Sequence, residues 1–173
     1  TSILQDNPIE TFSGQNYVKV YNYNHGMYSD NSNVTIAGVS GDKTGAALTI
    51  TAGTPNSTPA VGTFNGVVQG ATNGTGSGAT FDITTAGSPA AITSIKLATV
   101  GSGYVAGNTI TLTDFDGGTS DVTITVDTVG DTLGGIPIGA INGTYNAMDN
   151  VELDSFTVIP SLSAYDLKTG YVA

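Results

Sequence analysis

The sequence predicts an all-β protein, in which the two flanks of the chain form a β-sandwich-like domain with an inserted glycine- and threonine-rich β module. Several segments alternate apolar and polar residues with a period of two, the spacing of a half-buried strand. Glycine, asparagine, aspartate and proline separate these segments and supply the backbone angles of turns. No window of eleven or more residues has apolar positions at i, i+3, i+4 and i+7, so we expect little helix.

The predicted strands are the segments with the clearest alternation; in the first, Val18 and Val20 share one face. Short pieces at 146–149 and 163–167 are the only helix candidates. The proline-containing stretch 51–62 is expected to be a connector or an extended edge, because proline cannot sit in a central strand. The expected strands are 17–23, 33–39, 47–51, 79–85, 92–100, 108–113, 121–129 and 152–160.

Composition separates the middle of the chain from its flanks. Glycine, alanine, threonine and serine dominate the middle, whereas the flanks hold seven of the eight tyrosines and both methionines. Insertions are tolerated at surface hairpins, so this shift predicts one domain interrupted by another. The expected parts are a discontinuous sandwich of 11–42 and 135–160, an inserted module of 43–130, and terminal connecting segments of 1–10 and 161–173.

Charge and composition limit the partners. The chain has no arginine, and four lysines face fourteen acidic residues, which gives a formal net charge of -10. Nucleic acid is therefore not an expected partner, because neutralising phosphates requires clustered Lys and Arg. Cysteine is absent, and no apolar run approaches the ~20 residues that span a bilayer. The sequence begins at Thr1, and no basic region followed by an apolar run precedes the first predicted strand. We therefore expect that a signal peptide is absent or already removed, and that the chain is processed or is one segment of a longer polypeptide.

The stretch VGSGYVAGNTITLT, residues 100–113, contains three glycines, and glycine clusters can form ligand-binding loops. Phosphate-binding glycine loops open a helix, whereas this one leads directly into a predicted strand. We expect Gly101 and Gly103 to adopt positive φ, and Tyr104 to cover the turn with its hydroxyl on the backbone. Gly107 and Asn108 would form the next tight turn.

Three aspartates surround a Gly-Gly bend in TDFDGGTSD. Asp114, Asp116 and Asp121 are a candidate calcium site, since closely spaced carboxylates around a sharp turn are how oxygen ligands gather on this ion. The alternative is a solvated hairpin in which the aspartates form Asx-turns.

His25 is the only histidine, and Glu10 and Glu152 are the only glutamates. His25 with Asp30 and Asp42 would make an improvised metal site, and a turn cap is the simpler interpretation. Nothing in the sequence indicates that the two glutamates converge into the paired carboxylates of a glycosidase.

Motifs in both parts of the chain resemble modules of tailed bacteriophages. The flanks resemble small β-sandwich modules of phage structural proteins, particularly those of cyanophages, through VKV, HGM, NVTIAGV, INGTYNA and SFTVIP in that order. The middle resembles a second phage-associated module through GTFNGV, GTGSGATFDIT, ITSIKLATVGSGYVAGNTITL and DVTITV. Such modules recur in baseplate, tail-fibre and other virion proteins, so the resemblance implies a particle component on the exterior of the virion.

The expected function follows from this resemblance and from a composition with no plausible catalytic set. We expect a non-enzymatic virion structural protein of the tail, baseplate or fibre, without a cofactor, whose partners are copies of itself and other virion proteins. The alternative is a surface adhesin that binds a host glycan. Tyr21, Tyr23 and Tyr28 could then stack on sugars, although alternating aromatics also cover cores or subunit contacts.

Sheet edges and chain ends predict assembly. Monomers usually protect edge strands with lysine, proline or inward charge, and this chain has only four lysines. The ends, 1–12 and 162–173, are too apolar for free tails. We therefore expect neighbouring copies or adjacent domains to cover them, with closed cyclic symmetry as the expected arrangement of identical copies.

Overall fold

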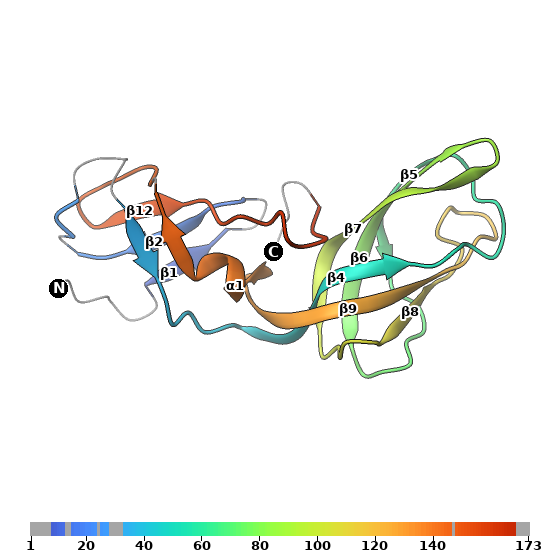
Figure 1. Cartoon of the computed structure of the whole chain (residues 1–173), viewed down its shortest axis with the longest axis horizontal. Helices are drawn as coiled ribbons and strands as arrows, with labels where there is room; N and C mark the ends of the chain where they lie inside the picture. Colours follow the sequence, from blue (N-terminus) through green and yellow to red (C-terminus); the bar gives the residue numbers. More distant parts are fainter. Residues whose placement is uncertain (1–7, 13–14, 24, 28–32, 147, 169–173) are drawn as a thin grey trace.

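The computed structural model describes residues 8–12, 15–23, 25–27, 33–146 and 148–168, and its strands form antiparallel sheets. Figure 1 shows two lobes side by side along the long axis. Segments from the two flanks of the chain form the lobe on the left, which we call the flank lobe (the described residues within 8–40 and 136–158). The middle of the chain forms the lobe on the right, the insert lobe (43–133).

The flank lobe contains two small sheets. In the first, β2 (Val18–Tyr21) lies between β1 (Ile9–Thr11) and β12 (Ser155–Val158). In the second, β3 (Val34–Ile36) pairs with β11 (Gly143–Tyr145). Each sheet thus joins the N-terminal flank to the C-terminal flank.

The insert lobe contains two sheets of longer strands. In one, β9 (Val122–Leu133) pairs with β4 (Lys43–Ala52) and with β8 (Thr109–Leu112). The end of β9 also pairs with β10 (Ile136–Pro137), which leads into the flank lobe. The other sheet has the order β5 (Gly62–Val68), β6 (Ser77–Gly87), β7 (Ala90–Ser102). After β9 the chain returns to the flank lobe through β10 and the short helix α1 (Ile138–Ile141).

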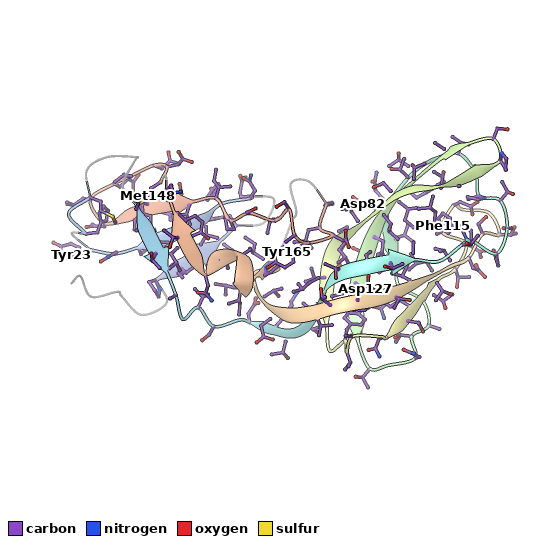
Figure 2. The ribbon with its side chains drawn as sticks, in the orientation of Figure 1. Tyr23, Asp82, Phe115, Asp127, Met148 and Tyr165 are labelled. Atoms are coloured by element: carbon purple, nitrogen blue, oxygen red, sulfur yellow. The ribbon has the colours of Figure 1, made fainter. Side chains whose placement is uncertain are left out.

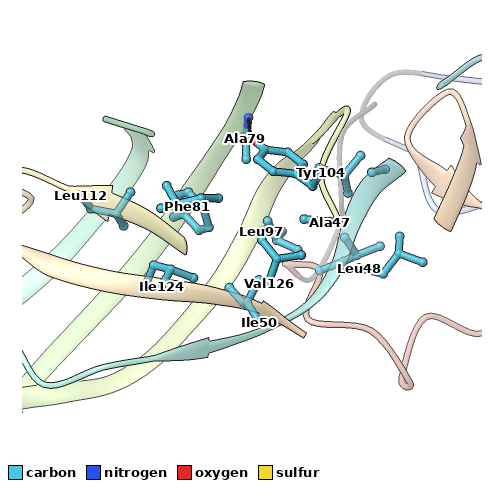
Figure 3. Packing of buried hydrophobic residues seen from close by; sticks show 14 of the residues in the cluster. Ala47, Leu48, Ile50, Ala79, Phe81, Leu97, Tyr104, Leu112, Ile124 and Val126 are labelled. Carbon is cyan, nitrogen blue, oxygen red and sulfur yellow. Dashed lines mark hydrogen bonds between the residues drawn. The ribbon is translucent and has the colours of Figure 1, made fainter. Parts of the chain in front are cut away.

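Alternation along the strands builds the core of the insert lobe. Phe81 and Ile83 of β6 and Ile124 and Val126 of β9 are fully buried and belong to one apolar cluster between the two sheets (Figure 3). Leu167, from the C-terminal segment, belongs to the same cluster. Burial of each large side chain of this kind contributes about 1.5–3 kcal/mol, so this cluster is the main source of stability in the lobe.

The flank lobe has a smaller core of its own. Val18 and Val20 of β2 pack with Phe156 and Val158 of β12, and all four are buried. Met148, which is 1% exposed, closes the same cluster. Each lobe therefore has a hydrophobic cluster of its own.

The expected fold class is confirmed, and the structure adds detail to it. Each of the eight expected strands overlaps one of β2, β3, β4, β6, β7, β8, β9 and β12. The strands β1, β5, β10 and β11 are additional, and no strand lies between residues 53 and 61. β1 includes part of the expected connecting segment 1–10, and β9 runs past residue 130 to Leu133.

The expected positions of helix were wrong for the described residues. The only described helix is α1, and neither 146–149 nor 163–167 is helical there. The physical reason is clear for the second piece, since the backbone of Asp166 bonds to β4 and β7 instead of to its own neighbours. A tertiary contact thus overrides the local preference.

Candidate functional site

Backbone shape explains the glycine–tyrosine turn at residues 100–108. Gly101 and Gly103 have φ angles of 63° and 74°, which glycine adopts without strain. Tyr104 is buried, and its hydroxyl accepts a hydrogen bond from the backbone N–H of Ala79 at 3.2 Å and donates one to Gln69. Burial raises the pKa of this phenol. The turn is built as the sequence predicts, and its hydroxyl is engaged within the protein.

In the aspartate loop, Asp116 holds the loop to the connector between β4 and β5. Its Oδ2 accepts the backbone N–H of Ala60 at 2.9 Å, and its Oδ1 accepts that of Gly118 at 3.0 Å. The hydrogen bond from Ala60, supported by those from Gly118 and Ser120, holds the pKa of the Asp116 carboxyl below its usual value. The carboxylate therefore acts as a capping group of the Asx type.

Asp121 has a similar role in the same loop. Its Oδ1 accepts the backbone N–H of Asp114 at 2.9 Å, and its Oδ2 accepts the side-chain amide of Asn56 at 3.2 Å. Within the described residues, no three His, Cys, Asp or Glu side chains are grouped so that they could hold a metal ion. The carboxylates of Asp116 and Asp121 thus bind backbone and amide groups of the protein, and Asp114 contributes its backbone N–H to the same loop.

The candidate tyrosines differ in their surroundings. The Tyr21 hydroxyl donates to Glu10 Oε2 at 2.7 Å, and this bond raises the pKa of the phenol. The Lys19 Nζ lies 5.1 Å from the centroid of the same ring. Tyr23 is 65% exposed at the outer end of the flank lobe (Figure 2). Tyr28 lies outside the described residues.

The two glutamates approach the same strand, which sequence reasoning missed. Glu10 is the cross-strand partner of Lys19 in the β1–β2 pair, and Glu152 Oε2 lies 4.0 Å from Lys19 Nζ. Only the register of the short strand β1 against β2 places Glu10 beside Lys19, so the sequence would have revealed this pair only if β1 had been recognised as a strand. Both glutamates are exposed, so this is a surface charge cluster that contributes little to stability.

His25 caps a turn in the flank lobe, as its simpler interpretation predicts. Its Nδ1 accepts the backbone N–H of Met27 at 3.0 Å, so Nε2 carries the proton and donates to the carbonyl of Glu152 at 2.7 Å. Asp30 lies outside the described residues, and Asp42 accepts a backbone N–H from the turn between β9 and β10. His25 is thus fixed by backbone groups on both ring nitrogens.

A cavity of about 690 Å³ opens in the flank lobe. Its wall comes from both small sheets and is mainly apolar, with Val20, Met27, Ile36 and Phe156 beside the ring of His25. The volume lies within the range of roughly 300–1,000 Å³ that is common for small-molecule sites. The cavity therefore lies between the two small sheets of this lobe, beside its apolar core.

The most specific set of contacts involves residues 165–168, which we call the strap. The strap lies against the free edges of β4 at Leu48–Ile50 and of β7 at Lys96–Leu97, and it also reaches Asp82 of the neighbouring strand β6. We call these acceptor residues together the seam. Asp166 donates its N–H to the carbonyl of Leu48 at 2.9 Å and accepts the N–H of Leu97 at 2.6 Å. The strap thus joins the two sheets of the insert lobe along their edges.

Side chains of the strap make this contact selective. The Asp166 carboxylate accepts the N–H of Ile50 at 2.9 Å and bonds to Lys96 Nζ at 3.2 Å. The Nζ atom of Lys168 lies 3.5 Å from Asp82 Oδ2. Between these two charges, Leu167 is 7% exposed and enters the core of the insert lobe.

The strap also brings the lobes together. Tyr165 packs against the insert core (Figure 2). Its hydroxyl lies beside Gly139 of α1, where the Cβ of any other residue would be only 3.1 Å from the hydroxyl oxygen. Leu162 packs against both cores. The segment predicted as a terminal connector therefore has a structural role in both lobes.

A comparison with known proteins found no matching family model, no matching curated protein and no matching solved structure. Among the described residues, no helix is long and apolar enough to cross a membrane.

Proposed function

We propose that the chain is a non-enzymatic structural protein on the exterior of a tailed-bacteriophage particle, in the tail, baseplate or fibre. The proposal begins with the resemblance of both parts of the sequence to phage modules. It adds an assembly role for the insert lobe, which projects from the flank lobe along the long axis of the molecule. The partners would be further copies of the chain and other virion proteins.

The observation that supports this role best is the way in which the two lobes are tied. The chain passes between them before β4, after β9 and again before the strap. At the last passage, Asp166 bonds to β4 and β7, while Leu162 packs against both cores. A module attached through one flexible linker would have no such ties. This construction suits a building block that must hold a fixed shape within a larger assembly.

The test is the composition of purified particles. Mass spectrometry of a purified tailed phage that encodes the chain should detect it in multiple copies. Antibodies raised against the insert lobe should decorate the tail region in electron micrographs. A chain that is expressed in the lysate but absent from purified particles would contradict the proposal.

A second candidate function is glycan binding by the flank lobe, and the exposure of Tyr23 favours it. The neighbouring Tyr21 is less suitable, because its hydroxyl is bonded to Glu10 and Lys19 lies over its ring. A glycan array should distinguish the two candidates. Binding that is lost in Tyr23→Ala would support the adhesin function, and an array without hits would exclude it.

A further inference from the structure

We propose that the seam between β4 and β7 is an acceptor site for the strap of a second copy of this chain, so that copies are linked by exchange of residues 165–168. The proposal deepens the proposed function, and it rests on that function only for the high local concentration of copies in a particle. The acceptor site itself is defined by the contacts of the described residues.

The seam must be filled. Leu48 and Leu97 are 8% and 0% exposed, and the strap supplies the partners of their backbone groups. The Leu48 carbonyl accepts from Asp166, while Leu97 donates to Asp166 and accepts from Lys168 at 3.0 Å. Buried backbone groups without partners are strongly disfavoured. An empty seam is therefore a poor alternative, and a strap that leaves must be replaced by an equivalent segment.

The seam also selects the sequence of its occupant. It presents the Lys96 ammonium to the aspartate of the strap and the Asp82 carboxylate to the lysine two positions later. Between them it buries one leucine side chain. Within the chain, the spacing Asp-x-Lys occurs only at Asp166–Lys168. The occupant that fits is thus this segment itself, either from the same chain or from another copy.

Exchange of the strap between copies changes only the path of the connector that leads to it, residues 159–164. The strap follows β12 through residues 159–164, and its contacts with the seam would be identical whichever chain supplied it. This is the condition under which identical copies swap an element at low cost. Ile159, at the start of the connector, is 53% exposed although it is apolar. A connector that crosses to a neighbouring copy could cover this side chain.

The consequence for assembly is directional. An exchanged strap ties the flank lobe of one copy to the insert lobe of the next, which is a head-to-tail contact. Such contacts form closed rings or open filaments, according to the angle between copies. High copy number in a particle favours exchange, because the effective concentration of neighbouring straps rises.

The experiment uses the natural absence of cysteine in the chain. Two full-length variants, Lys168→Cys and Asp82→Cys, each carry one thiol, and the two positions form the ion pair between strap and seam. The variants are mixed in denaturant, refolded together and treated with a short bismaleimide. Cross-linked heterodimer on a denaturing gel then requires that the strap of one chain lies in the seam of the other.

A matched control replaces Asp82→Cys by Ala91→Cys, an exposed position near the far end of β7. We expect at least about tenfold more heterodimer from the Lys168→Cys and Asp82→Cys pair, because a docked strap raises the effective concentration of its thiol. A yield equal to that of the control would overturn the proposal.

The double variant Asp82→Cys/Lys168→Cys carries both thiols on one chain, so its cross-links distinguish a strap docked in its own chain from a strap docked in another copy. Cross-linked dimers and higher species support exchange, whereas cross-linked monomer alone overturns it, and so does the absence of any cross-link. Circular dichroism verifies that each variant is folded. Failure of exchange would leave the detection of the chain in purified particles unaffected, so the two proposals can fail separately.

Discussion

The insert lobe and the flank lobe are built from the same kind of strand but differ in strand length. The long strands of the insert lobe, β4, β6, β7 and β9, have 10, 11, 13 and 12 residues, whereas β1, β2, β3, β11 and β12 of the flank lobe have 3 or 4. Long strands allow several inward-facing side chains in succession, so the insert lobe has a continuous core. The flank lobe has a small core beside a cavity.

From this difference we expect the inserted module to be the more stable half of the molecule. Small cores leave little margin over the entropy of ordering the chain. The flank lobe is therefore expected to depend on its connections to the insert lobe, through β10, α1 and the strap. Substitutions in each lobe should reveal this dependence.

The largest effect is expected from Phe81→Ala in the insert core. Phe81 is 0% exposed, and its removal should lower the free energy of unfolding by about 3–5 kcal/mol. The matched variant in the flank lobe is Phe156→Ala, at a residue that is 3% exposed but lines the cavity. Its loss should be smaller, at the lower end of the same range, about 3 kcal/mol, because Phe156 borders the cavity.

Hydrogen exchange measured by mass spectrometry, together with urea unfolding, distinguishes the lobes. Phe81→Ala should accelerate exchange in both lobes, because the flank lobe depends on the insert lobe. Phe156→Ala should accelerate exchange in the flank lobe alone. The opposite pattern, with global unfolding caused by Phe156→Ala only, would reverse the comparison.

The next effect concerns the glycine turn that closes the insert lobe. In Gly101→Ala, the new Cβ would meet the backbone nitrogen of Ala79 at 2.7 Å, at a φ angle of 63°. Strain and crowding together should lower stability by about 3 kcal/mol. Gly107 has a φ angle of 89° with open space around it, so Gly107→Ala should cost about 1 kcal/mol. Equal melting temperatures for the two variants would refute this explanation of the turn.

Alternation in the sequence was sufficient for the long strands and for the short strands β2, β3, β8 and β12, but not for β1, β5, β10 and β11. β5 has Asn65 and Gly66 in its middle, and a register shift between Phe64 and Val67 interrupts its pairing with β6. A bulge of this kind destroys a period of two. β1 has three residues, too few for any periodic signal, so only its pairing with β2 defines it as a strand.

The candidate sites were harder to predict, because their chemistry depends on long-range contacts. The aspartates at 114–121 are close in sequence, but Ala60, which binds Asp116, comes from a distant connector. Asp166 has no local signal, and its partners Leu48 and Leu97 lie far away along the chain. The one hint was compositional, since the end of the chain is too apolar for a free tail.

A smaller effect is expected where the strap meets the seam. Asp166→Ala removes the carboxylate that binds the Ile50 N–H and Lys96, and should lower stability by about 1–2 kcal/mol. The Ile50 amide should lose protection from hydrogen exchange, because it loses its acceptor. The control is Asp127→Ala, which removes one exposed bond to Thr51 and should change stability by less than about 0.5 kcal/mol. Unchanged protection of Ile50 would contradict the assigned contact.

The smallest effect concerns how the stability of the protein depends on pH through Asp116, at the outer end of the insert lobe. Hydrogen bonds from Ala60 and its neighbours hold the pKa of Asp116 below the ordinary value of 3.8. A carboxyl with a lowered pKa in the folded state contributes stability that is fully present above its ordinary pKa and is lost as pH falls through the folded pKa. Asp116→Asn should therefore reduce stability at neutral pH and flatten the loss of stability below about pH 4.

Asp114→Asn, in the same loop, serves as the control. Thermal unfolding of both variants between neutral and acid pH measures the difference, and parallel pH profiles for wild type and Asp116→Asn would show that the bond from Ala60 does not stabilise the charged carboxylate.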